Sequence, residues 1–307
     1  MSHDPAPIKA VPLRRPWRWV SAVVVVVVLA LFVYGAATNE AYDWTTYGKY
    51  LFDQRVSAAA VVTLELTVIA MVGAVLLGVL FAVMRLSSNP VLRAVSWLYL
   101  WFFRGTPIYV QLVFWGLVTV IYQRWKLGIP FGPTFYTVDL LAFGRTASAA
   151  FVFACIGLAL NEAAYMAEIV RAGINSVDEG QTEAAEALGM TRSQTLRRIV
   201  LPQAMRVIIP PTGNEVISML KTTSLVVAVP LSTELYSRTR DIAVPIARPV
   251  ALLLVAATWY LAVTSVLMVG QYFLERRFAR GSSRATAGGA VAVQAVGVPS
   301  QQGAGGG

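Results

Sequence analysis

Residues 176–202 read SVDEGQTEAAEALGMTRSQTLRRIVLP, a polar stretch between two long apolar segments. SVDE at 176–179 and TRSQ at 191–194 have the spacing of capping boxes, which begin helices. Gly189 can adopt a positive φ and so end the first helix. The Leu-Pro pair at 201–202 is expected to stop the second. The pattern predicts two short helices joined by a tight glycine turn.

The surrounding chain is dominated by apolar runs of membrane-spanning length. Its 307 residues are 57% hydrophobic and 13% charged, which leaves too few charges to cover a water-exposed surface. Roughly 20 apolar residues are needed to cross a bilayer. Uncharged runs close to that length cover residues 19–39, 66–84, 105–123, 146–161 and 250–274. Each of these runs predicts a transmembrane helix.

Residues 203–229 form a less obvious sixth span. Arg206, Glu215 and Lys221 interrupt it, and the Pro-Pro pair at 210–211 is expected to break the helical ladder. Counting it as a span places 16 of the 25 Lys and Arg residues in inner segments and eight in outer ones, as the positive-inside rule requires. We therefore expect an all-α membrane protein with six transmembrane helices and both termini in the cytoplasm.

The two ends of the chain differ from its centre. Residues 1–18 are basic and Pro-rich, and we expect them to lie in the cytoplasm before a first helix at 19–39. A signal peptide is the alternative for that helix, because GAA at 35–37 has the form of a cleavage site, although the apolar run is long for one. Residues 281–307 are low-complexity Gly, Ala, Ser and Gln, which is typical of a disordered tail.

The polar stretch resembles the EAA loop of ABC importer permeases, with matching spacing at every marked position. The residues that carry the resemblance are Glu183, Ala184, Ala185, Gly189, Ile199, Leu201 and Pro202. Three flanking segments are similar to the polar amino acid branch of that family: RGTP at 104–107, NEAAYMAEIVR at 161–171 and KTTSL at 221–225. The resemblance covers about residues 57–277, which leaves the first helix as an accessory.

This resemblance implies the fold of a type I ABC importer transmembrane domain in the bacterial cytoplasmic membrane. The loop at about 176–202 would be the coupling helix, seated in a cleft of a separate ATP-binding cassette ATPase subunit. The resemblance also implies a second permease subunit, either the same chain or a relative. An extracytoplasmic amino-acid-binding protein would deliver a polar amino acid of the glutamate, glutamine, histidine or arginine class.

Several other chemistries are excluded by residue types that the sequence lacks. The only Gly-Lys pair is at 48–49 and is followed by Tyr50, so no phosphate-binding loop is encoded and a partner must hydrolyse ATP. Cys155 and His3 are single residues of their kinds, so we expect no catalytic group, metal site or cofactor. The +9 net charge follows the expected membrane topology, and no motif suggests nucleic acid.

Four polar residues within the expected spans are candidates for the substrate path: Asn161, Glu162, Asn214 and Glu215. Polar groups at membrane depth are costly and are therefore functional candidates. A carboxylate can accept the ammonium group of an amino acid, and a neighbouring amide can orient it. A buried ion pair between Glu215 and Lys221 is the alternative explanation for that carboxylate.

Two further features have structural explanations. Glu168 and Arg171 are three positions apart, so they can pair on one face of a helix. The aromatic cluster WLYLWFF at 97–103 is typical of a membrane-interface belt rather than a ligand cage.

Two other functions remain as alternatives for a chain of this kind. An ATP-independent secondary transporter or channel often contains inverted repeats, and the sequence shows no second copy of the polar loop or of the Pro-interrupted span. A membrane-anchored signalling or scaffold protein would use the loop to recruit a partner, but the polar residues at 203–229 argue against a simple anchor.

Overall fold

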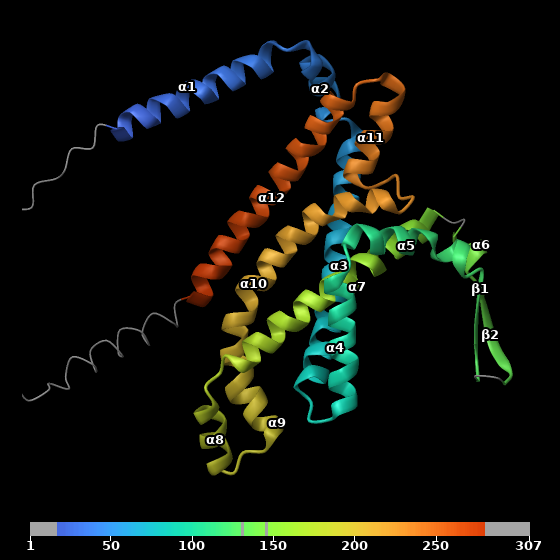
Figure 1. Ribbon diagram of the computed structural model, residues 1–307, viewed down its shortest axis with the longest axis vertical. Helices are drawn as coiled ribbons and strands as arrows, with labels where there is room; N and C mark the ends of the chain where they lie inside the picture. The colour runs from blue at the N-terminus through green and yellow to red at the C-terminus, as the bar shows by residue number, and fades with distance from the viewer. Residues whose placement is uncertain (1–16, 130–131, 145–146, 280–307) are drawn as a thin grey trace, which may run out of the picture.

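A computed structural model describes residues 17–129, 132–144 and 147–279 of the chain, and nearly all of them are helical (Figure 1). The helices are α1 (Trp17–Thr38), α2 (Trp44–Leu51), α3 (Gln54–Leu86), α4 (Pro90–Gly105), α5 (Ile108–Ile121), α6 (Leu140–Gly144), α7 (Ala147–Asn175), α8 (Glu179–Ala187), α9 (Arg192–Thr195), α10 (Leu201–Thr222), α11 (Leu235–Ile246) and α12 (Pro249–Ala279). Short 3₁₀ or π segments are η1 (Glu40–Tyr42), η2 (Leu196–Val200) and η3 (Thr223–Ala228). Most of residues 1–18 and the whole of 281–307 lie outside the described residues.

Four helices of the described part are long and apolar enough to cross a membrane, namely α1, α3, α7 and α12. The pair α4 and α5 qualifies as a fifth span when taken together, although it bends by 102° at the break between the two helices. The sequence predicts a transmembrane helix at 105–123. The structure places α5 within that run but makes it only 14 residues long, and α4, which completes the candidate span, was not anticipated. The chain is thus a mostly helical membrane protein with four or five candidate spans.

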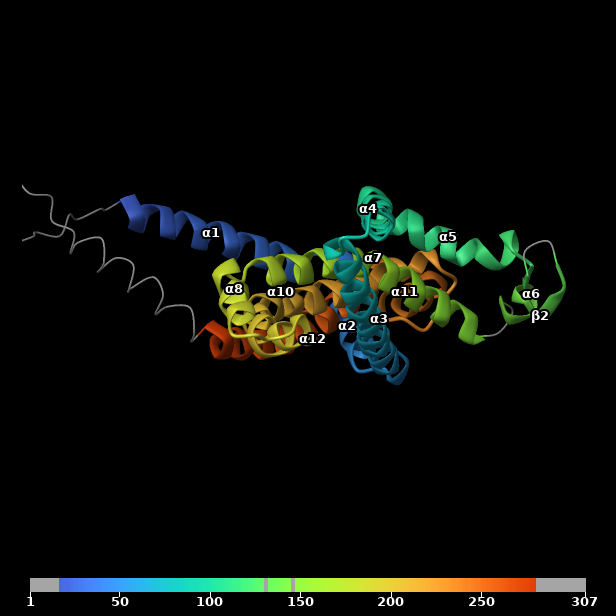
Figure 2. The same ribbon diagram turned by 90° about the horizontal axis from the view of Figure 1, so that it is seen from below.

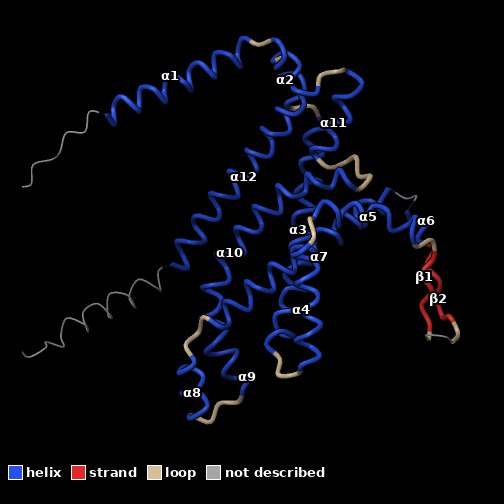
Figure 3. Tube along the Cα trace, viewed as in Figure 1, coloured by secondary structure: helices blue, strands red, loops and turns tan. Residues whose placement is uncertain are grey.

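The prediction of an all-α chain is also wrong in one place. Strands β1 (Arg124–Gly128) and β2 (Thr134–Asp139) form an antiparallel hairpin between α5 and α6. β1 contains Trp125 and β2 is rich in aromatic and β-branched residues, which favour extended structure, and the connection includes Gly132 followed by Pro133. Figure 3 shows this hairpin as strand among described residues that are otherwise helix or loop.

The centre of the bundle is the packing of α3 against α7, to which α5 and α10 add further side chains. Buried residues from these four helices form the largest apolar cluster, including Leu66, Leu112, Leu158 and Met219. Gly78 of α3 lies so close to α7 that any side chain there would meet the backbone of that helix. α4 and α12 lie on opposite sides of this centre (Figures 1 and 2).

The first helix extends away from the bundle, and it contains no buried residue (Figure 1). Its connection to the rest of the chain is made by α2, which packs against α12. Trp259 of α12 donates a hydrogen bond to the carbonyl of Leu51 at 2.8 Å, and the Tyr47 hydroxyl lies 3.1 Å from that of Thr258. These contacts fix α2 on α12 and leave α1 with its apolar surface exposed.

The Pro-Pro pair at 210–211 does not interrupt α10, although the sequence predicts a break there. Gln271 of α12 donates a hydrogen bond to the carbonyl of Pro210 at 2.8 Å, and its amide also bonds to Glu275. The helix is therefore supported at its prolines by α12.

Candidate functional site

The loop that carries the EAA residues projects beyond the ends of α7 and α10 (Figure 1). Its first helix, α8, is capped by Asp178, whose side chain accepts a hydrogen bond from the Gly180 amide at 2.8 Å. The sequence predicts Ser176 as the cap, and this is wrong. α7 runs on to Asn175, so the Ser176 hydroxyl still donates to the carbonyl of Gly173 in the last turn of that helix.

Gly189 ends α8 as predicted, with φ at 76°. Its amide donates to the carbonyl of Glu186 at 2.9 Å, and the next amide, of Met190, donates to that of Ala185 at 3.1 Å. These two bonds have the pattern of a Schellman motif, which satisfies the last carbonyl groups of a helix. The turn is therefore determined by a few consecutive residues and does not depend on the rest of the bundle.

The second helix of the loop begins as predicted and ends differently. Thr191 and Gln194 form the predicted capping box, each side chain bonding to the other residue's backbone amide. The helix does not stop at Pro202 but continues through one π-helical turn, η2, into α10. The wider turn, in which Leu201 donates to the carbonyl of Leu196, can accommodate the proline ring without breaking the helix.

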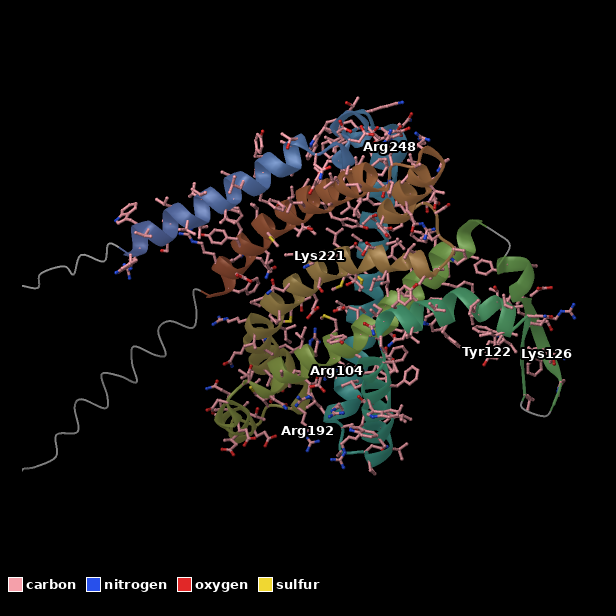
Figure 4. The ribbon with its side chains drawn as sticks, turned by 45° about the horizontal axis from the view of Figure 1, so that its top comes forward. Arg104, Tyr122, Lys126, Arg192, Lys221 and Arg248 are labelled. Carbon is pink, nitrogen blue, oxygen red and sulfur yellow. The ribbon has the colours of Figure 1, made fainter. Side chains whose placement is uncertain are left out.

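The seven EAA-type residues differ in their exposure. Ala185 is buried, Ile199 and Leu201 are half-buried, and the others are exposed: Glu183, Ala184, Gly189 and Pro202. α8 packs against η2, and Arg192 of the loop lies near the lower end of the molecule (Figure 4). A short rigid helix with an exposed face can lie in a groove of another protein.

The structure brings together two of the four candidates for the substrate path. Glu162 of α7 is buried, and its carboxyl group faces that of Glu215 on α10, which is half-buried. Within the described part of the chain, Oε1 of Glu162 accepts no hydrogen bond. Two carboxylates at close range repel each other unless a proton or a cation lies between them. The arrangement can therefore bind a cationic group.

The other two candidates are placed apart from this pair of carboxyl groups. Asn161 is buried and donates hydrogen bonds to the carbonyl of Phe103 at 3.1 Å and to Gln111 Oε1 at 3.2 Å. Its amide thus supports the junction of α4 and α5. Asn214 lies next to Glu215 on α10, but its side chain is exposed.

Two pairings considered from the sequence have different outcomes. Glu168 and Arg171 pair as predicted, with Nη2 of Arg171 at 2.7 Å from Oε2 of Glu168. The alternative pair of Glu215 with Lys221 is not among the ion pairs of the described residues, and Lys221 is exposed.

Sequence reasoning missed two polar residues that the structure places in central positions. Gln111 donates to the carbonyls of Phe103 and Thr106 and to the Thr106 hydroxyl at the bend between α4 and α5. The sequence feature that could have revealed Gln111 is a polar amide inside an apolar run. Glu234 is fully buried at the start of α11, where it accepts bonds from Thr63 and from two backbone amides. Its partners lie far away in the sequence, so no local pattern indicates its burial.

A bundle of apolar helices that holds paired carboxyl groups inside and a rigid helical loop at one end defines a subunit of a membrane transport system. Residues 74–280 match the family described as binding-protein-dependent transport system inner membrane component. The chain belongs to this family. It is therefore a multi-pass permease subunit of a bacterial ABC importer, the transport component of a system that also contains ATPase and binding-protein subunits.

Individual relatives extend this assignment over nearly the whole chain. The chain is 59% identical to the arginine transport system permease protein ArgU of Corynebacterium glutamicum, over 92% of this chain and 86% of the relative. It is 37% identical to the L-cystine transport system permease protein TcyL of Bacillus subtilis, over 61% and 71%.

Solved structures show the same fold. An amino acid ABC transporter determined with histidines is 32% identical, with a TM-score of 0.60 over 73% of this chain and 94% of that chain. The MetNI methionine ABC transporter in an inward-facing conformation is 16% identical, with a TM-score of 0.55 over 73% and 96%, and it supports the fold alone.

Proposed function

We propose that this permease carries polar amino acids, and that the basic class, represented by arginine, is preferred. The observation that carries the proposal is the buried carboxyl group of Glu162 facing Glu215 across the contact of α7 and α10. A guanidinium or ammonium group between them would relieve the repulsion of the two carboxylates and supply Oε1 of Glu162 with a donor.

The named relatives support the same class of substrate. ArgU is called an arginine transport system permease, and the solved amino acid transporter with 32% identity was determined with histidines. Other curated relatives are named for cystine and glutamine, which are polar but not basic at the side chain. The paired carboxyl groups are the feature of this chain that favours the basic members of that range.

We further propose that the chain has six transmembrane helices with both termini in the cytoplasm. α10 is the sixth span, although its charges keep it below the composition that identifies the others. With this topology the loop of α8 and α9 lies in the cytoplasm. There it would seat in a cleft of the ATP-binding cassette ATPase, with Glu183 and Ala184 on its exposed face.

The remaining partners follow from the same proposal. A second permease subunit, the same chain or a relative, would complete the path, and it would cover part of the apolar surface that this chain leaves exposed. An extracytoplasmic amino-acid-binding protein would deliver substrate to the opposite end of the bundle from α8 and α9.

The proposal is tested by ATP-driven uptake of labelled arginine and glutamine into liposomes that contain the importer with all its partner subunits. Glu162→Gln should raise the arginine concentration for half-maximal uptake by roughly tenfold or more, since hydrogen bonds to charged groups contribute ~1.5–3 kcal/mol. Glutamine uptake, where it occurs, should change less.

Glu162→Asp is the matched control, because it retains the charge and should retain most of the arginine uptake. Unchanged arginine affinity in Glu162→Gln would rule out the contact. Uptake that proceeds equally without ATP would contradict the coupling to an ATPase.

A further inference from the structure

A charged cavity lies on a different face of α7 from Glu162. It has a volume of about 420 Å³ and lies between α3, α4 and α7. Its lining includes Arg85, Trp97, Trp101, Arg104, Tyr165 and Glu168, and we call it the arginine pocket. Six residues, or about 240° of helical rotation, separate Glu162 from Glu168, so the two carboxyl groups lie on different faces of α7.

The arginine pocket has more positive than negative charge. Arg171 donates two hydrogen bonds to Oε2 of Glu168, at 2.9 and 2.7 Å, and so neutralises that carboxylate. The guanidinium groups of Arg85 and Arg104 approach Oε1 of Glu168 only to 3.9 and 4.0 Å, beyond hydrogen-bond distance. These two groups therefore retain donors for an anion, and three arginines face one glutamate.

The arginine pocket lies toward the end of the bundle that carries the α8–α9 loop. Arg85 lies one residue before the end of α3, and Glu168 lies in the last two turns of α7, which leads into the α8–α9 loop. Figure 4 shows Arg104 in the region where α4 approaches α7, on the same side of the molecule as Arg192 of the loop. A cluster of arginines at this depth is suited to the headgroup region of a membrane.

Aromatic side chains border the arginines. Trp97 and Trp101 stack with their rings nearly parallel, 6.3 Å apart, and both are more than half exposed. The guanidinium of Arg104 lies over the ring of Tyr165, 5.5 Å from its centre. Trp and Tyr rings are favoured where apolar and polar surroundings meet, and guanidinium groups bind phosphates with paired donors. The arginines thus suit the phosphate of an anionic phospholipid, and the aromatic side chains suit the apolar region next to it.

We propose that the arginine pocket binds the phosphate of an anionic phospholipid headgroup, held by Arg85 and Arg104, with the adjoining acyl region against Trp97 and Trp101. Free phosphate would be attracted to the same guanidinium groups but would gain nothing from the tryptophans. This site is independent of the substrate path, since none of its residues is a candidate for contact with the transported amino acid.

The test uses the complete importer in nanodiscs that contain phosphatidylcholine and phosphatidylglycerol. After extraction, native mass spectrometry measures how strongly phosphatidylglycerol is enriched among the retained lipids. The double variant Arg85→Gln/Arg104→Gln should lose most of that enrichment, by roughly fivefold for each arginine. Arg93→Gln is the matched control, since Arg93 is an exposed arginine of α4 that does not line the pocket, and it should leave the enrichment unchanged.

Glu168→Gln provides a variant with the opposite expected sign. It removes the negative charge of the arginine pocket, so phosphatidylglycerol enrichment should rise, whereas damage to the fold would lower it. Equal enrichment in the double variant and the parent, or an equal loss in Arg93→Gln, would overturn the proposal. Displacement of the bound lipid by millimolar inorganic phosphate as readily as by added phosphatidylglycerol would also overturn it, in favour of a free-phosphate site.

Discussion

Two of the corners at which the chain changes direction are built in different ways. At Gly189, the turn between α8 and α9 is made by a positive φ, two backbone bonds to α8 and a capping box at Thr191. At Thr106, the 102° bend between α4 and α5 is held by side-chain amides, and Asn161 comes from α7, 58 positions beyond the carbonyl of Phe103 that it contacts. One corner is local and the other depends on the bundle.

This difference shows what each corner can do. A turn fixed by its own residues keeps its shape when the surrounding helices move. In the proposed complex, the α8–α9 loop would therefore transmit a displacement between the ATPase and the membrane helices. A bend fixed by α7 must change when α7 moves. The α4–α5 bend therefore responds to rearrangement of the bundle, and it lies next to the candidate substrate contact at Glu162.

The largest effect is expected from changing Gly189 itself. No atom lies within 4 Å of the position that a Cβ would take, so the cost of Gly189→Val is backbone strain at φ 76° and not a clash. Distortion of the turn should lower ATP-driven uptake by roughly an order of magnitude or more, while the protein remains in the membrane. Transport assays in liposomes, with membrane content measured by immunoblot, provide the comparison.

Two variants separate strain from other causes. Gly189→Asn should retain most of the uptake, because Asn tolerates the left-handed region. Gly270→Val in α12, where a Cβ also meets nothing within 4 Å, should have little effect. Normal uptake in Gly189→Val would remove the case for a rigid local turn.

The same contrast explains how much of the fold was predictable. Helix positions for the apolar runs, the glycine turn and the second capping box follow from spacing within a few residues, and the structure confirms them. The α4–α5 bend and the uninterrupted α10 were missed. The bend is held by Asn161 from another helix, and Gln271 of α12 contacts α10 at Pro210; no local pattern reports such partners.

The residues of the candidate site also divide into those that a local pattern indicates and those that depend on packing between helices. The EAA residues were found from one continuous stretch of sequence. The carboxyl residues at 162 and 215 were each chosen as polar groups within a span, but their juxtaposition required the packing of α7 on α10. Glu234 was missed entirely. The hydrogen bonds that compensate for the burial of its carboxyl group come from Thr63 and from the α11 backbone.

The second prediction tests the corner that depends on the bundle. Gln111→Leu removes three donated hydrogen bonds and leaves the carbonyl of Thr106 without the amide at the bend. We expect a loss of ~1–2 kcal/mol in stability, measured by thermal unfolding of the purified complex, because side-chain bonds between membrane helices have modest strength. Gln123→Leu, at an exposed position after α5, is the control and should be close to neutral.

A smaller effect is expected at the capping box of the local corner. Thr191→Ala removes the hydroxyl that accepts from the Gln194 amide and should cost ~1 kcal/mol locally. Faster hydrogen exchange in residues 191–195, without a change in α3 or α7, is the expected readout. Ser193→Ala nearby changes an exposed residue outside the capping box and should leave exchange unaltered. Loosening that spreads into α7 would show that the corner is not local.

Asp43 has both a local partner, Thr46, and a distant one, Arg248. Its titration is expected to have the smallest effect on stability. Its side chain accepts bonds from the amide and hydroxyl of Thr46, which lower the pKa of the carboxyl below its usual value, and Arg248 before α12 lies 3.2 Å away. A carboxyl with a lowered pKa in the folded state adds stability that is complete above its unfolded pKa and is lost as the pH falls through the folded one. Stability between α2 and α12 should therefore decline slightly below about pH 4.

Asp43→Asn should flatten that part of the profile, whereas Asp241→Asn, at an exposed position of α11, should not. If Arg248→Gln alone flattened it as fully as Asp43→Asn, the distant arginine, and not the local cap, would govern this corner.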